Sequence, residues 1–136
     1  MAKVPPPPVP VYNGGNTYIK QLEEGNLRYL TGKQSGGKAV SEAQLREKLA
    51  EFGQEPWAII ISCSDSRVPV ERLFDTGPGD LFVVRVAGNI ISSPVGGLIG
   101  SVEYGVEHLK SKVVLVMGHT KCGAVTTAVR FSRSGE

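Results

Sequence analysis

Two cysteines and one histidine are the residues of this chain whose types and spacing best support metal chemistry. Cys63 comes shortly after the apolar run Ala58–Ile61, and His119 and Cys122 follow a second apolar run, Val113–Met117. Thiolate and imidazole ligands suit Zn²⁺ in a tetrahedral site whose fourth position is open. Zinc in such a site lowers the pKa of bound water towards about 7, which provides a nucleophile at neutral pH. The residue types leave a second interpretation open, namely two buried free cysteines and a polar histidine.

The apolar runs that precede these residues predict the elements that position them. Trp57–Ser62 and Val113–Met117 are typical of buried strands in a parallel sheet. Ligand sites in open α/β sheets lie beyond the carboxyl ends of the strands, so two such strand ends can lie side by side. His119 and Cys122 form a short chelating turn, whereas the distant Cys63 matches no zinc-finger spacing.

The rest of the pattern predicts one α/β domain, a parallel sheet flanked by helices. A further strand is expected at Leu81–Val86, and a glycine-rich connector at 88–100. Helices are expected over 16–30, from Ser41 to 52, and over 68–76, 101–109 and 124–131. Residues 1–15 contain five prolines and predict a proline-rich tail or arm, favoured as a linker or packing arm over a ligand for another domain.

Length, charge and apolar content limit the kinds of partner that the chain can have. The chain has 136 residues, enough for one domain, and its formal net charge of +2 is too mild and scattered to indicate nucleic-acid binding. A small anion is a more natural partner. No run of 18 apolar residues predicts a membrane span, and no signal peptide is visible. Because a disulfide would compete with zinc for the two cysteines, we expect a reducing compartment, the cytoplasm or an organelle stroma.

Four motifs in order resemble the β-class carbonic anhydrases. They are Cys63-Ser64-Asp65-Ser66-Arg67, Gly79–Asn89, Ser101-Val102-Glu103-Tyr104 and Gly118-His119-x-x-Cys122-Gly123. The resemblance runs from about residue 18 to residue 129 and implies a zinc lyase for reversible hydration of carbon dioxide to bicarbonate and a proton by attack of zinc-bound hydroxide. Family members continue for several tens of residues, so 16–136 is expected to be an incomplete domain that lacks a C-terminal strand and helices. The strand at Val113 would then lie at an exposed edge.

The resemblance also implies roles for single residues. Cys63, His119 and Cys122 correspond to the three zinc ligands. Asp65 and Arg67 correspond to a catalytic pair in which the arginine holds the carboxylate ready to accept a hydrogen bond from the zinc-bound hydroxide. In a closed state known in the family, the aspartate becomes the fourth zinc ligand.

A substrate pocket is implied by resemblance to the plant-like branch of the family. In that branch a glutamine at the position of Gln54 reaches the substrate from the neighbouring subunit, so a homodimer or higher homo-oligomer is expected. Phe82 and Tyr104 fall at pocket-lining positions of that branch, and they are otherwise ordinary core aromatics. Ala87 and Gly88 are expected to complete a narrow apolar slot for carbon dioxide.

Two alternatives keep the zinc site. One is a hydrolase of carbonyl sulfide or carbon disulfide on the same fold, because related enzymes use a similar ligand set. The other is a non-catalytic zinc-binding or assembly subunit, which the short C-terminal part favours and the intact Asp65 and Arg67 oppose.

Overall fold

The computed structural model describes residues 16–35, 42–91 and 96–134. The expected tail 1–15, the helix start at Ser41 and part of the glycine-rich connector lie outside them. In chain order the elements are α1 (Thr17–Leu30), α2 (Glu42–Phe52), β1 (Ala58–Ser62), α3 (Val70–Leu73), β2 (Leu81–Arg85), the short 3₁₀ turn η1 (Ala87–Asn89), α4 (Gly97–Glu107), β3 (Val113–Met117) and α5 (Gly123–Ser134). The expected α/β class is confirmed. No helix in these segments combines the length and the apolar character needed to cross a membrane.

The three strands form one parallel sheet in the order β2-β1-β3. β1 is central, and all five of its residues are buried. Ser62, its last residue, lies opposite Arg85 of β2 and Met117 of β3. All three strands therefore end at the same edge of the sheet, and the loops that follow β1 and β3 are neighbours.

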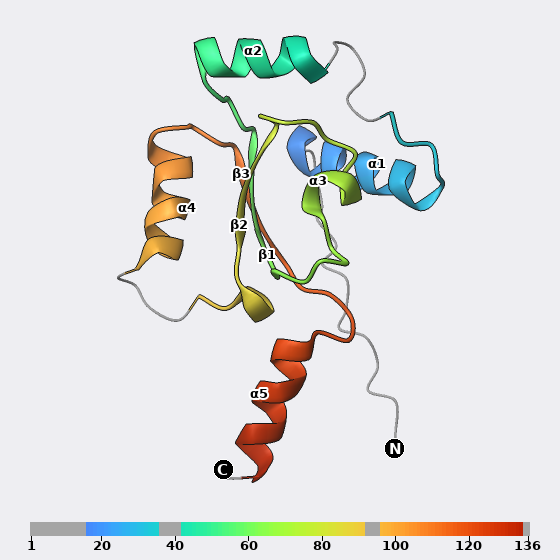
Figure 1. Ribbon diagram of the computed structural model, residues 1–136, viewed down its shortest axis with the longest axis vertical. Coiled ribbons are helices and arrows are strands. Elements are labelled where there is room, and N and C mark those ends of the chain that lie inside the picture. Colours follow the sequence, from blue (N-terminus) through green and yellow to red (C-terminus); the bar gives the residue numbers. More distant parts are fainter. Residues whose placement is uncertain (1–15, 36–41, 92–95, 135–136) are drawn as a thin grey trace.

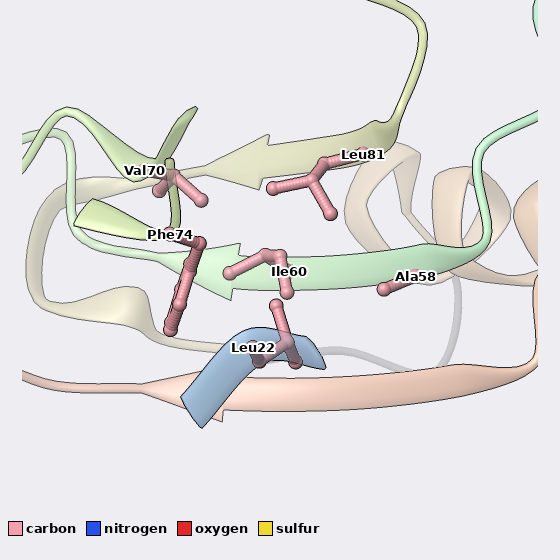
Figure 2. Packing of buried hydrophobic residues seen from close by; sticks show 6 residues of the cluster. All are labelled: Leu22, Ala58, Ile60, Val70, Phe74 and Leu81. Carbon is pink, nitrogen blue, oxygen red and sulfur yellow. The ribbon is translucent and has the colours of Figure 1, made fainter. Parts of the chain in front are cut away.

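One face of the sheet packs against α1 and α3. Alternate residues of β1, Ala58 and Ile60, point to this face because side chains of a strand alternate between its two faces. They pack with Leu22 of α1 and with Val70 and Phe74 in and after α3 (Figure 2). In Figure 1 these two helices lie on one side of the sheet and α4 lies on the other.

The opposite face packs against α4. Ile59 and Ile61 of β1 and Val84 of β2 form a second buried cluster, against which Leu98 and Val102 of α4 pack. The helix begins at Gly97, so the prediction of a start at Ser101 was four residues late. Glycine has low helix propensity, but the apolar contacts of Leu98 outweigh that cost.

β3 is an edge strand that is covered on one face only. Its residues alternate between partly buried and exposed, and Val114 and Val116 are 43% and 59% exposed. Within the described residues α4 contacts β2, which leaves this face of β3 open. The expected exposed edge at this strand is confirmed for the described part of the chain. α5 leaves the carboxyl end of β3 and extends away from the sheet (Figure 1).

Candidate metal centre

The loops after β1 and β3 bring the cysteines and the histidine together. One potential ligand atom from each of Cys63, His119 and Cys122 lies within 4.8 Å of the other two. The two Sγ atoms are 3.8 Å apart, and both cysteines are buried. The expected meeting of two strand ends is therefore confirmed.

The donor set fits zinc. Two sulfur atoms each about 2.3 Å from a tetrahedral zinc ion lie about 3.8 Å apart, which agrees with the 3.8 Å between Cys63 Sγ and Cys122 Sγ. His119 Nδ1 lies 3.0 Å from the Thr120 carbonyl oxygen, which can only accept a hydrogen bond, so Nδ1 carries the proton. Nε2 then keeps its lone pair, and in the described residues it is buried without a hydrogen-bond partner. An unpaired buried nitrogen beside two sulfurs is what a metal ligand requires.

Cys63 lies in surroundings that favour its thiolate. The Gly88 amide donates a hydrogen bond to Cys63 Sγ at 3.2 Å. This bond, followed by the one from the Asp65 amide, lowers the pKa of Cys63 to about 6, although burial opposes the shift. Gly88 has φ 71°, a backbone conformation that favours glycine. The turn after β2 therefore aims an N–H group at the sulfur, and the thiolate form is the one that binds metals.

Asp65 and Arg67 form a hydrogen-bonded ion pair beside these candidate ligands. Asp65 Oδ1 accepts hydrogen bonds from the Arg67 amide and Nε, both at 2.9 Å, and Oδ2 accepts one from Nη2 at 2.8 Å. The side-chain hydrogen bonds from Arg67 hold the pKa of Asp65 well below its usual range. Asp65 Oδ2 is also 3.8 Å from His119 Nε2. An ionised carboxylate therefore lies next to the three candidate ligands.

Arg67 also connects the two loops. Its Nη2 donates a hydrogen bond to the carbonyl oxygen of Lys121 at 3.1 Å, between His119 and Cys122. The carboxylate raises the pKa of the guanidinium further, so Arg67 stays charged. The position of Asp65 is thus tied to the second ligand loop as well as to its own.

A hollow of about 370 Å³ opens beside the candidate metal ligands. Gly88 and Asn89 line it from the turn after β2, and Gly118 to Cys122 line it from the loop after β3, apart from Thr120. Val125 and Thr126 of α5 complete the wall. The hollow gives small molecules access to the side of the cluster that faces α5.

The other predicted pocket residues lie away from this hollow in the described chain. Phe82 and Tyr104 pair with ring centroids 6.0 Å apart, on the face of the sheet that α4 covers. Gln54 is exposed near the amino end of β1 and lines a different hollow together with Trp57. Ala87 is exposed next to Gly88. One copy of the chain therefore brings Gly88 to the metal ligands but not Gln54, Phe82 or Tyr104, whose pocket roles stay predictions.

Two further residues at the centre were not predicted from the sequence. Asn89 lines the hollow. Arg85, the last residue of β2, donates hydrogen bonds to the main-chain carbonyls of Cys63 and Asp65. The available signal was a charged residue at the end of a buried apolar strand, at the edge where the metal site was expected.

Comparison with known proteins identifies relatives of the chain. A family model described as carbonic anhydrase matches residues 58–136. Carbonic anhydrase 2 of Mycobacterium tuberculosis is 44% identical over 117 residues, which cover 85% of this chain and 53% of that protein. A carbonic anhydrase of Mycolicibacterium smegmatis is 40% identical, with 86% of this chain and 54% of that protein covered. The chain spans about half the length of the curated relatives it matches.

Solved structures agree with the sequence comparison. The β-carbonic anhydrase CcaA matches with a TM-score of 0.63 at 34% identity, covering 86% of this chain and 55% of that one. A tetrameric β-carbonic anhydrase from the ascomycete Sordaria macrospora matches with a TM-score of 0.61 at 36% identity, covering 85% and 55%. Since the family model covers more than half of the chain and the matched fold is that of the β class, the chain belongs to the β-class carbonic anhydrases.

Proposed function

We propose that residues 16–136 carry the zinc site of an enzyme that reversibly hydrates carbon dioxide to bicarbonate and a proton. The observation that carries the proposal is the meeting of Cys63, His119 and Cys122 beside the ion pair of Asp65 and Arg67. A structural zinc site has four protein ligands, whereas a site with three protein ligands leaves the fourth coordination position for a water or a substrate. The ionised carboxylate next to that position gives the site a second chemical group.

Zinc bound to these three ligands would supply Lewis acidity, which lowers the pKa of a coordinated water towards about 7. Asp65 would orient the nucleophile. A carboxylate offers about four acceptor sites, and three hydrogen bonds from Arg67 occupy two on Oδ1 and one on Oδ2. The free acceptor site is on Oδ2, the oxygen 3.8 Å from His119 Nε2. Asp65 can therefore accept one hydrogen bond from the attacking group and fix the direction of its lone pair.

Arg67 would keep the site in its open state. Because the arginine fork fixes the direction of the Asp65 carboxylate, that group would have to leave Arg67 to become a fourth zinc ligand. Carbon dioxide is small enough to reach the centre through the hollow beside α5. We propose that the closed state requires the pair to break first.

The proposal includes a homo-oligomer. One of the matched structures is described as tetrameric, and Gln54 lies near the amino end of β1 while the metal ligands lie beyond the carboxyl ends. A glutamine at that place contributes to a metal centre only if a second copy brings it there. Phe82 and Tyr104 would line the same pocket.

The experiment measures zinc content and stopped-flow hydration of carbon dioxide on the same purified samples. We expect Cys63→Ser to lose zinc and activity together, because a hydroxyl is a poor replacement for a thiolate ligand. We expect Asp65→Ala to keep zinc and to lower turnover by about 10- to 100-fold, as outer-shell changes do. Glu47→Ala, which removes an exposed carboxylate on α2, is the matched control and should change neither quantity.

Three results would contradict parts of the proposal. Full zinc content and full activity in Cys63→Ser would show that the ligands are wrongly assigned. A zinc-loaded but inactive parent protein would favour a non-catalytic zinc-binding subunit. Faster turnover of carbonyl sulfide or carbon disulfide than of carbon dioxide, measured in the same assay series, would reassign the substrate.

A further inference from the structure

Arg85 lies at the end of β2, next to the candidate metal centre, and the proposed reaction does not yet use it. Its Nε donates a hydrogen bond to the Cys63 carbonyl oxygen at 3.0 Å, and its Nη2 donates one to the Asp65 carbonyl oxygen at 2.7 Å. A guanidinium is a planar fork of donors, so one side chain can bridge two acceptors in a fixed geometry. The fork spans the loop that carries both the first metal ligand and the carboxylate.

In the described part of the chain the charge of Arg85 has no carboxylate partner. Among the described residues no ion pair involves Arg85. Both of its recorded hydrogen bonds go to the main chain of the Cys63–Asp65 loop. An arginine at a strand end is ordinarily free to extend into water, and ordering it costs side-chain entropy. Here the side chain is ordered against the loop.

The loop has other ties to the segment after β2, and they hold Cys63 and its two neighbours. The Ser64 amide donates to the Val86 carbonyl at 3.2 Å, and the Val86 amide donates to the Ser62 carbonyl at 3.1 Å. Gly88 holds the sulfur of Cys63 through its amide. In the described chain the bond from Arg85 is the one that ties Asp65 to β2. Loss of Arg85 would therefore leave Cys63 in place and free the Asp65 main chain from β2, while the Asp65 carboxylate stays bonded to Arg67.

We propose that Arg85 is a positioning residue, which holds the Cys63 and Asp65 carbonyls and so sets where the Asp65 carboxylate stands relative to the metal ligands. The inference rests on the proposed function for its effect on turnover. Arg85 acts through Asp65, because its own hydrogen bonds go to main-chain carbonyls.

The test compares Arg85→Gln and Arg85→Lys with Arg46→Lys, a control on an exposed arginine of α2. In zinc-loaded Arg85→Gln we expect one zinc per chain and a 10- to 100-fold lower kcat, the usual range for outer-shell partners. Arg85→Lys keeps the charge and the aliphatic stem but not the fork. We expect Arg85→Lys to have the thermal midpoint of the parent protein but a turnover as low as that of Arg85→Gln. Arg46→Lys should match the parent throughout.

A double-variant cycle separates positioning from general damage. If Arg85 acts through Asp65, then Arg85→Gln should lower kcat by no more than about twofold when Asp65 is already alanine. Full additivity of the two losses would overturn the proposal, as would parental turnover in Arg85→Gln or in Arg85→Lys. Failure of Arg85→Lys to fold would assign the residue to stability alone and would also overturn it.

Hydrogen exchange gives a readout that needs neither metal nor activity. The amides of Arg67 and Val68 donate hydrogen bonds to the carboxylate and the carbonyl of Asp65, so both should exchange faster in Arg85→Gln than in the parent. Unchanged exchange would refute the inference even if turnover fell. If the parent protein does not hydrate carbon dioxide, the proposed function fails, and exchange alone then decides whether Arg85 orders the loop.

Discussion

The contact between α1 and the residue after α3 allows a sharp test of the packing. Gly25 is buried in α1, and a Cβ atom added to it would lie 1.9 Å from the Phe74 carbonyl oxygen and 2.7 Å from the carbonyl carbon. Both atoms belong to the main chain, so no side-chain rotation relieves the clash. Gly25→Ala must therefore displace α1 by about 1 Å before the Cβ atom reaches the 3.0 Å that real contacts require.

The structure sets the size of the effect. Overpacking of this kind costs about 1–3 kcal/mol. A displaced α1 also loses the hydrogen bond from Asn26 Nδ2 to the Leu73 carbonyl, worth about 1 kcal/mol. Alanine gains about 1 kcal/mol over glycine in helix propensity. We expect the free energy of unfolding of Gly25→Ala to be lower than that of the parent by about 1–3 kcal/mol. Each kcal/mol lost should lower the thermal midpoint by roughly 4 °C.

The control is the same substitution where space is free. Gly100 lies inside α4, and a Cβ atom there meets nothing within 4 Å. Gly100→Ala should therefore gain up to about 1 kcal/mol from helix propensity alone. Urea unfolding of metal-free protein, followed by circular dichroism, measures both values. If Gly25→Ala is as stable as the parent or more stable, the reasoning about this contact is wrong.

Three further predictions concern stability and metal binding. Asp75 has a fully buried carboxylate that accepts hydrogen bonds from Arg28 and Ser35. Asp75→Ala should therefore lower the free energy of unfolding by about 2–3 kcal/mol. A loss of less than about 1 kcal/mol in urea unfolding would contradict this role. Gly105→Val should cost about 1–3 kcal/mol because its Cβ would lie 2.7 Å from buried Ile59 Cδ1; calorimetry showing an unchanged midpoint would refute it. Free zinc at about 100 times its dissociation constant should stabilise the parent by about 2.7 kcal/mol, a chelator should remove the gain, and a zinc response in Cys63→Ser equal to that of the parent would speak against the ligand assignment.

The strands and the metal ligands could be predicted because their signals are local. Each apolar run is short and uninterrupted, which predicts a buried strand, and each polar residue that follows lies at that strand's carboxyl end whatever the sheet order. Cys63, His119 and Cys122 were therefore expected at one edge, and their ligand atoms lie within 4.8 Å of one another.

Other features depended on packing that no local pattern encodes. The start of α4 at Gly97 follows from the contacts of Leu98 with the sheet, whereas glycine alone favours a loop. Gln54 and Tyr104 carry no signal of which site they approach, because that depends on the arrangement of copies and faces.

The sequence by itself determined a parallel α/β sheet with Cys63, His119 and Cys122 at its carboxyl edge, because apolar runs and the ligand types that follow them are properties of short segments. Only the tertiary structure decided the order β2-β1-β3. That order puts the end of β2 beside the Cys63 loop, where the Gly88 amide meets the sulfur and Arg85 meets two carbonyls. Hydrogen bonds between segments about 20 residues apart depend on which strands are neighbours, and the three-dimensional pairing alone determines that.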